Sequence, residues 1–146
     1  MAAVLRVSAT VDYALRAAIV LARAQGQPVT ASEIATTEDL PGKFLAATLA
    51  SMRQAGLLCS RRGGSGGFWL SRPAEEITVA DLVRAIDGSV VDLSAVRGGA
   101  TAAWWAAAAA SIEASLSGVS LAELAQLDDL DLSVPGDASS PGAARS

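Results

Sequence analysis

The sequence has 146 residues, a length that suits one domain or one domain with an appendage. Its single cysteine and its lack of histidine exclude an intramolecular disulfide, zinc sites of the usual kind and histidine-based catalytic triads. The net charge is −4, and alanine raises the hydrophobic content to 51%, a composition typical of helix-rich proteins.

The charge is unevenly distributed along the chain. Residues 41–72 contain five basic residues and no acidic one, whereas residues 89–146 contain seven acidic residues and two arginines. Because salt screens charges over about 8–10 Å, the local sign decides which partner a surface attracts. The basic stretch favours phosphate contact, with an ordinary solvated face as the alternative.

The apolar runs are short. The longest, residues 102–110, falls below the roughly 20 residues needed to span a bilayer, and no charged-then-apolar signal peptide opens the chain. We therefore expect a cytoplasmic protein without a membrane partner.

The first predicted helix covers residues 7–24, with apolar side chains at helical spacing. Thr30 and Glu33 form a capping box that opens a short second helix. A third helix follows residues 40–42, with Pro41 in its first turn, and ends at Gly56, a predicted left-handed cap. Its predicted buried stripe consists of Phe44, Leu45, Leu49 and Met52.

Residues 57–71 follow as two short apolar strands joined by a glycine-rich loop, with Arg61 and Arg62 at its base. Glycine lets the backbone approach a sugar-phosphate surface, and guanidinium groups match phosphate and guanine geometry. This order of elements is typical of a winged helix-turn-helix domain, in which the third helix enters the major groove. We therefore predict a mainly α fold with a small β-hairpin that binds double-stranded DNA.

The C-terminal part is predicted to be helical and then disordered. Thr78 opens a fourth helix that ends at Gly88, and a long alanine-rich helix covers residues 102–116 after a loop. We favour this long C-terminal helix for dimerisation, because so apolar a helix needs another surface to cover it, with intramolecular packing as the alternative. Its stripe consists of Trp105, Ala109, Ile112 and Leu116.

Three regions follow from these elements. Residues 1–88 are predicted to form the winged helix-turn-helix DNA-binding domain, and residues 89–127 the loop and the dimerisation helices. The last of these helices starts at the capping box of Ser120 and runs through Leu124 and Leu127. Residues 128–146, rich in acidic and small residues, are predicted to be a disordered acidic tail.

Short motifs occur in order between about residue 7 and residue 127. They are Asp12-Tyr13-Ala14-Leu15-Arg16-Ala17, Thr30-Ala31-Ser32-Glu33-Ile34-Ala35, Phe44-Leu45, Ala55-Gly56-Leu57-Leu58, Arg62-Gly63 with Gly66-Gly67-Phe68, and Arg72-Pro73-Ala74-Glu75-Glu76-Ile77-Thr78. Together they resemble the Rrf2 family of bacterial transcriptional regulators. The resemblance implies a homodimer on a partly palindromic operator, with the long helix crossing to the partner subunit and Trp105 matching a recurring tryptophan.

The resemblance fails at one loop. Many members of that family carry three cysteines in the stretch matching residues 90–103 and hold an iron–sulfur cluster there. This stretch contains neither cysteine nor histidine, and such clusters need thiolates, assisted in some proteins by imidazole. The chain therefore resembles cluster-free members, which answer to small molecules, protein partners or other thiols. We expect no cofactor, no metal site and an effector of unknown kind.

The candidate DNA contacts lie mainly on the third helix and the hairpin. Lys43 is the candidate for base-edge or phosphate contact, whereas the outward Ala46 and Ala47 weaken direct readout, although alanine can contact a thymine methyl. By resemblance, Arg62 aligns with a wing arginine inserted into the minor groove, where narrow A·T-rich DNA attracts arginine. The predicted DNA-binding residues are Tyr13, Lys43, Ala46, Ala47, Ser51, Arg61, Arg62, Gly63 and Ser65.

Several of these roles have alternatives. Tyr13, Arg61 and Ser65 are predicted backbone contacts, but Tyr13 also suits the core. Cys59 suits either a thiol switch or a small apolar position in a strand. Trp104 is a candidate for lining an effector pocket.

The leading functional prediction is a sequence-specific repressor. The alternative is a protein-interaction module on a degenerate DNA-binding fold, against which the retained basic hairpin argues. An enzyme is not expected, because the glycines of residues 63–67 lie between strands and lack the following Gly-Lys-Ser/Thr of a phosphate loop.

Overall fold

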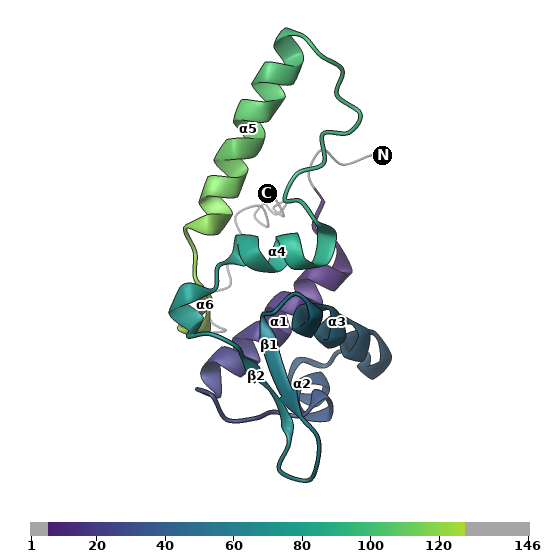
Figure 1. Ribbon diagram of the computed structural model, residues 1–146, viewed down its shortest axis with the longest axis vertical. Coiled ribbons are helices and arrows are strands. Elements are labelled where there is room, and N and C mark those ends of the chain that lie inside the picture. Colours follow the sequence, from purple (N-terminus) through teal and green to yellow (C-terminus); the bar gives the residue numbers. More distant parts are fainter. Residues whose placement is uncertain (1–5, 128–146) are drawn as a thin grey trace, which may run out of the picture.

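The computed structural model describes residues 6–127 (Figure 1). The elements are α1 (Ala9–Arg23), α2 (Ala31–Glu38), α3 (Gly42–Gln54), β1 (Leu58–Arg61), β2 (Gly67–Leu70), the 3-10 helix η1 (Ala74–Glu76), α4 (Val79–Asp87), α5 (Ala100–Ser117) and α6 (Leu121–Ala125). The predicted fold, mainly helical with one antiparallel hairpin, is confirmed. The tail predicted to be disordered, residues 128–146, lies outside the described residues.

Local side-chain chemistry sets several helix ends. Thr30, Thr78 and Ser120 each form a capping box with the acidic residue three positions later, so that free N–H groups at the starts of α2, α4 and α6 are satisfied. Gly56 ends α3 with φ +85°, a left-handed conformation that glycine adopts without strain. These boundaries agree with the sequence prediction. Pro41 differs slightly, since it is the N-cap of α3 rather than a residue of its first turn.

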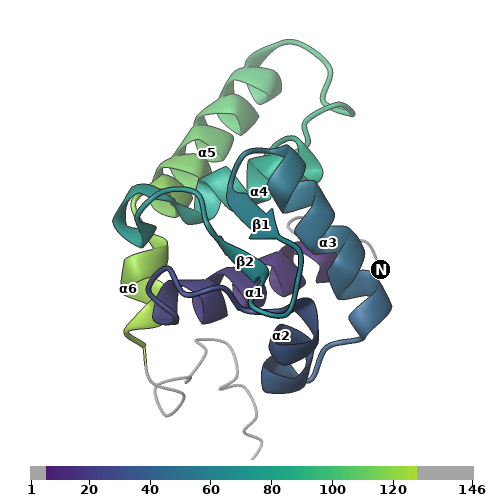
Figure 2. The same ribbon diagram turned by 60° about the horizontal axis from the view of Figure 1, so that its bottom comes forward.

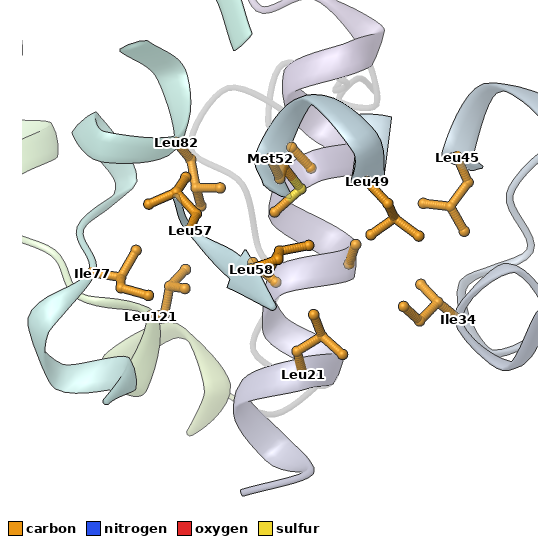
Figure 3. Packing of buried hydrophobic residues seen from close by; sticks show 13 residues of the cluster. Leu21, Ile34, Leu45, Leu49, Met52, Leu57, Leu58, Ile77, Leu82 and Leu121 are labelled. Carbon is orange, nitrogen blue, oxygen red and sulfur yellow. The ribbon is translucent and has the colours of Figure 1, made fainter. Parts of the chain in front are cut away.

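One cluster of buried side chains joins the helices around α1 (Figure 3). Leu21 of α1 belongs to it, as does Ile34 of α2. Leu121 of α6 is fully buried in the same cluster, and α6 packs along α1 (Figure 2). The chain therefore returns to the core formed by its N-terminal helices after α5. The other labelled members are Leu45, Leu49, Met52, Leu57, Leu58, Ile77 and Leu82.

The buried face of α3 differs from the prediction at one residue. Leu45, Leu49 and Met52 are buried as expected, together with Thr48, but the side chain of Phe44 is 65% exposed. The buried positions recur at three- and four-residue intervals and share one side of the helix, whereas Phe44 lies about 100° around the axis from Leu45. The prediction that Phe44 belongs to the core is wrong.

The hairpin is tied to the loop before α2. Val29 exchanges two backbone hydrogen bonds with Phe68 of β2, of 3.0 and 2.8 Å, and so forms an isolated antiparallel bridge that the sequence analysis did not identify. Gly67 permits this approach, because it has φ +142° and a Cβ atom there would lie 2.7 Å from the carbonyl carbon of Val29. Strand β2 is therefore held on both sides near the loop of the hairpin, by β1 and by Val29.

Helix α5 has no fully buried residue among residues 6–127. Its predicted stripe is half-buried, while most other positions of the helix are exposed. The contact with α4 includes an ion pair between Arg84 and Glu113, and Figure 1 shows the first half of α5 extending beyond α4. Across residues 6–127, no helix combines the length and the apolar character that crossing a membrane requires.

Candidate nucleic-acid interface

Helix α3 and the hairpin form one unit. The end of α3 packs against β1, and the Nη1 atom of Arg53 donates a hydrogen bond of 2.9 Å to the hydroxyl oxygen of Ser60. Figure 2 shows the hairpin and α3 next to each other, with α2 below the loop of the hairpin in this view. A duplex that contacts one of these two elements can therefore contact the other.

The unit carries four cationic side chains that are free of carboxylates. Lys43, Arg53, Arg61 and Arg62 are all exposed, and none of them takes part in the ion pairs found within residues 6–127. The fifth basic residue of this segment, Arg72, differs because it lies 3.9 Å from Asp81 of α4. The charge available for phosphate contact is therefore smaller by one than the sequence count indicated.

The loop of the hairpin holds its two arginines differently. Arg61 donates a hydrogen bond of 3.1 Å to the carbonyl oxygen of Ser65, and its guanidinium lies 5.9 Å from the centre of the Trp69 ring. Arg62 makes no side-chain hydrogen bond to any described residue and is exposed. Arg61 thus stabilises the shape of the loop, while the guanidinium of Arg62 keeps all its donors for a ligand.

The tight turn of this loop depends on glycine. Gly63 has φ +110°, and its carbonyl oxygen accepts a hydrogen bond of 3.0 Å from the N–H of Gly66. A Cβ atom on Gly66 would lie 2.0 Å from the carbonyl oxygen of Arg61, closer than any side chain allows. The glycines therefore set the position from which Arg62 projects.

The predicted outward residues of α3 are exposed. Lys43 lies in the first turn, followed by Ala46 and Ala47 and then by Ser51. Exposure is what DNA contact requires, and the contacts themselves stay predictions. The structure adds Phe44 to this exposed surface. Stricter use of the helical period would have found it, because the buried face is complete without it.

The remaining candidates lie elsewhere. Tyr13 of α1 and Cys59 of β1 are both half-buried, and Cys59 pairs with Trp69 across the hairpin. Trp104 is 63% exposed and packs edge-on against Trp105, with ring centres 4.9 Å apart. None of these positions adds a charge to the cationic unit.

The described residues offer few metal ligands. Within residues 6–127, no three His, Cys, Asp or Glu side chains are grouped so that they could hold a metal ion. The loop of residues 88–99 contains one such side chain, Asp92, and the pKa of Asp92 is lowered because its carboxylate accepts a hydrogen bond from the backbone N–H of Ser94. The only thiol of the sequence, Cys59, lies on β1 instead. This donor set does not fit an iron–sulfur cluster, which is held by several thiolates.

Comparisons with known proteins agree with the geometry. The family profile described as "Rrf2: Iron-dependent Transcriptional regulator" matches residues 7–127. A Mycobacterium tuberculosis protein (strain H37Rv) named as an HTH-type transcriptional regulator is 35% identical over 131 residues, which cover 83% of this chain and 81% of that relative. The HTH-type transcriptional regulator CymR of Bacillus subtilis is 32% identical over 87 residues, 59% of this chain and 63% of CymR.

Solved structures show the same similarity. The structure of CymR, described as the global cysteine regulator of B. subtilis, matches with a TM-score of 0.74 and 29% identity over 86% of this chain and 99% of that one. The structure of T. potens IscR matches with a TM-score of 0.71 and 32% identity over 85% of this chain and 93% of that one. In sequence and in fold, the chain is similar to regulators of transcription.

Proposed function

This chain belongs to the Rrf2 family of DNA-binding transcriptional regulators, and from that membership we propose that it is a cytoplasmic repressor that binds a partly palindromic operator as a homodimer. A dimer bound across a promoter would occupy the DNA that the polymerase needs. Members of this family regulate transcription and are not enzymes.

The observation that carries the proposal is the set of four exposed cations on α3 and the hairpin. None of the four is neutralised by a neighbouring carboxylate within residues 6–127. Neutralising phosphates with such side chains releases condensed counterions, which supplies most of the sequence-independent affinity for DNA. The side chains of α3 and the free guanidinium of Arg62 then supply contacts to base edges.

The dimer is supported by α5. Helix α5 is half alanine, has no fully buried residue among residues 6–127 and leaves most of its 18 positions exposed. An exposed apolar surface of this kind is typical of an interaction site. Pairing α5 and its stripe of Trp105, Ala109, Ile112 and Leu116 with a second copy would cover that surface. It would also present two copies of α3 to half-sites about one helical turn of DNA apart.

We further propose that this regulator works without an iron–sulfur cluster. The support is the chemistry of the donors, because the whole sequence contains one cysteine and no histidine. The signal would then be a small molecule or a protein partner.

The proposal is tested by recovering its DNA. Genomic fragments bound by the purified protein are sequenced, and the recovered site is titrated with protein at fixed salt. We expect a site with two related half-sites, a complex of two chains per duplex by sedimentation velocity, and lower transcription from a promoter that contains the site.

Three results would contradict the proposal. They are a monomer that binds no fragment at low salt, a recovered site without related half-sites, and higher transcription when the protein is present. A monomer that captures a protein but no DNA would instead support the interaction module. For the cluster, anaerobically purified protein that contains stoichiometric iron and sulfide would refute the cluster-free proposal.

A further inference from the structure

The recognition surface of α3 contains a large apolar side chain that its own fold does not use. Phe44 lies in the first turn and is 65% exposed, whereas the three leucine and methionine positions that follow it on the helix are fully buried. Removing an exposed phenylalanine leaves the hydrophobic core intact, so this side chain does not stabilise the fold. As an apolar group in water it does not increase the solubility of the protein either. Phe44 follows Lys43 on the helix that is expected to enter the major groove, which suggests that its role is to contact DNA.

The neighbours of Phe44 also lack hydrogen-bonding groups. Among residues 42–47, the only side chain that can donate a hydrogen bond is that of Lys43, and no side chain can accept one. Thr48 follows, but it is buried and its hydroxyl donates to the carbonyl oxygen of Phe44, 3.0 Å away. The exposed side chains in the first half of α3 therefore comprise one charged donor and otherwise only apolar groups.

Apolar surface in the major groove has one favourable base partner. Thymine presents a 5-methyl group there, while cytosine and adenine present amino groups that need an acceptor. An amino group covered by a phenyl ring would lose its water and find no replacement partner. Phe44 and Ala47 lie three residues apart, so that they share one side of the helix.

We propose that α3 recognises thymine methyl groups, with Phe44 and Ala47 as the side chains that contact them, so that the operator half-site has thymines at the positions facing the start of α3. The inference rests on the proposed function, because it requires α3 to enter the major groove. Lys43 then contacts phosphate or a guanine edge beside these thymines, and specificity comes from the methyl groups.

The test removes the methyl group without changing base pairing. The operator recovered from genomic DNA is prepared with thymine and with deoxyuridine in its half-sites, and binding is measured at fixed salt for the wild-type protein and for F44A. Wild-type affinity should fall about fourfold for each contacted thymine that loses its methyl. F44A should bind the thymine operator more weakly than the wild type and should be less sensitive to deoxyuridine.

Two further variants control the comparison. F44L keeps an apolar side chain and should retain part of the preference for thymine over deoxyuridine. Gln54→Ala changes an exposed residue at the other end of α3 and should retain all of it. Because Phe44 is exposed, thermal unfolding of F44A should match that of the wild type, so that a binding change reports on the contact.

The outcomes distinguish a failure of the proposed function from a failure of the proposal about Phe44 and thymine. A wild-type protein that binds no genomic fragment would overturn the proposed function and this inference with it. Operator binding that is equally strong with thymine and deoxyuridine, or equally reduced by deoxyuridine in the wild type and in F44A, would overturn the inference and leave the regulator in place. In the last case, the effect would come from altered DNA shape rather than from Phe44.

Discussion

Replacing Arg62 with alanine should weaken operator binding and leave the fold intact. The guanidinium is exposed and makes no ion pair or hydrogen bond with any residue in the range 6–127, so its removal should change the free energy of unfolding by less than about 0.5 kcal/mol. Removing a good DNA-binding side chain costs about 1–3 kcal/mol. At 1.36 kcal/mol per tenfold change, the Kd should rise about 5- to 150-fold.

The assay is fluorescence anisotropy of a labelled operator, first at fixed salt and then across a salt series. If Arg62 contacts a phosphate, the slope of log affinity against log salt should become shallower by about 0.9 for each phosphate that is no longer neutralised. The R62K variant separates the effect of the positive charge of Arg62 from the effect of its planar guanidinium, because lysine keeps the charge but lacks the planar fork of donors.

Arg72→Ala is the matched control. It removes the same formal charge from the same segment of the chain, but Arg72 is paired with Asp81 and lies beyond the end of β2. Its operator affinity should stay close to that of the wild type. An R62A protein that binds as well as the wild type would refute the role of Arg62. Equal losses of affinity in R62A and R72A would show that net charge, and not the geometry of the hairpin, governs binding.

Three further predictions concern the framework that presents these residues. Gly67→Ala should lower the free energy of unfolding by about 1–3 kcal/mol, because φ is +142° and the added carbon meets backbone, whereas Gly64→Ala, with open space around it, should not; equal melting temperatures would contradict this. Leu121→Ala should destabilise the protein by about 2–5 kcal/mol in urea titration, since the side chain is fully buried against α1, and a smaller loss would show that α6 is not part of the core. The pKa of Glu33 is lowered because the backbone N–H and the hydroxyl of Thr30 donate to its carboxylate. This stabilisation is present above the ordinary pKa of a glutamate and is lost as the pH falls through the lowered value. Glu33→Gln should therefore destabilise the protein at about pH 7 and progressively less as the pH falls below the ordinary pKa of a glutamate. An effect that is independent of pH would contradict this.

Much of the fold could be predicted from the local sequence. The capping boxes at Thr30, Thr78 and Ser120 and the left-handed Gly56 depend on residues within a few positions of one another, and each lies where the sequence predicted. The hairpin was accessible for the same reason, since its register follows from a short glycine-rich loop between two apolar segments.

The candidate site could be predicted only in part. The cationic residues of α3 and the hairpin were identified from their positions in the sequence, but the free charge was overestimated, because Arg72 is paired with Asp81 of α4. Phe44 was assigned to the core on hydrophobicity, although the buried positions Leu45, Thr48, Leu49 and Met52 complete one face of α3 at helical spacing without it. A sequence gives the polarity of a residue, whereas its exposure depends on which other side chains pack against it in the folded protein.

The sequence by itself determined which segments are helical, where several of them begin and end, and that the positive charge collects around one hairpin. Only the tertiary structure decided that Val29 bonds to the hairpin at Phe68, that Leu121 returns to the core beside α1, and that α5 has no fully buried residue among residues 6–127. The physical reason is the separation along the chain between the residues that interact. Caps and turns are governed by hydrogen bonds between residues close in the chain, whereas burial and ion pairing depend on segments brought together from distant parts of it.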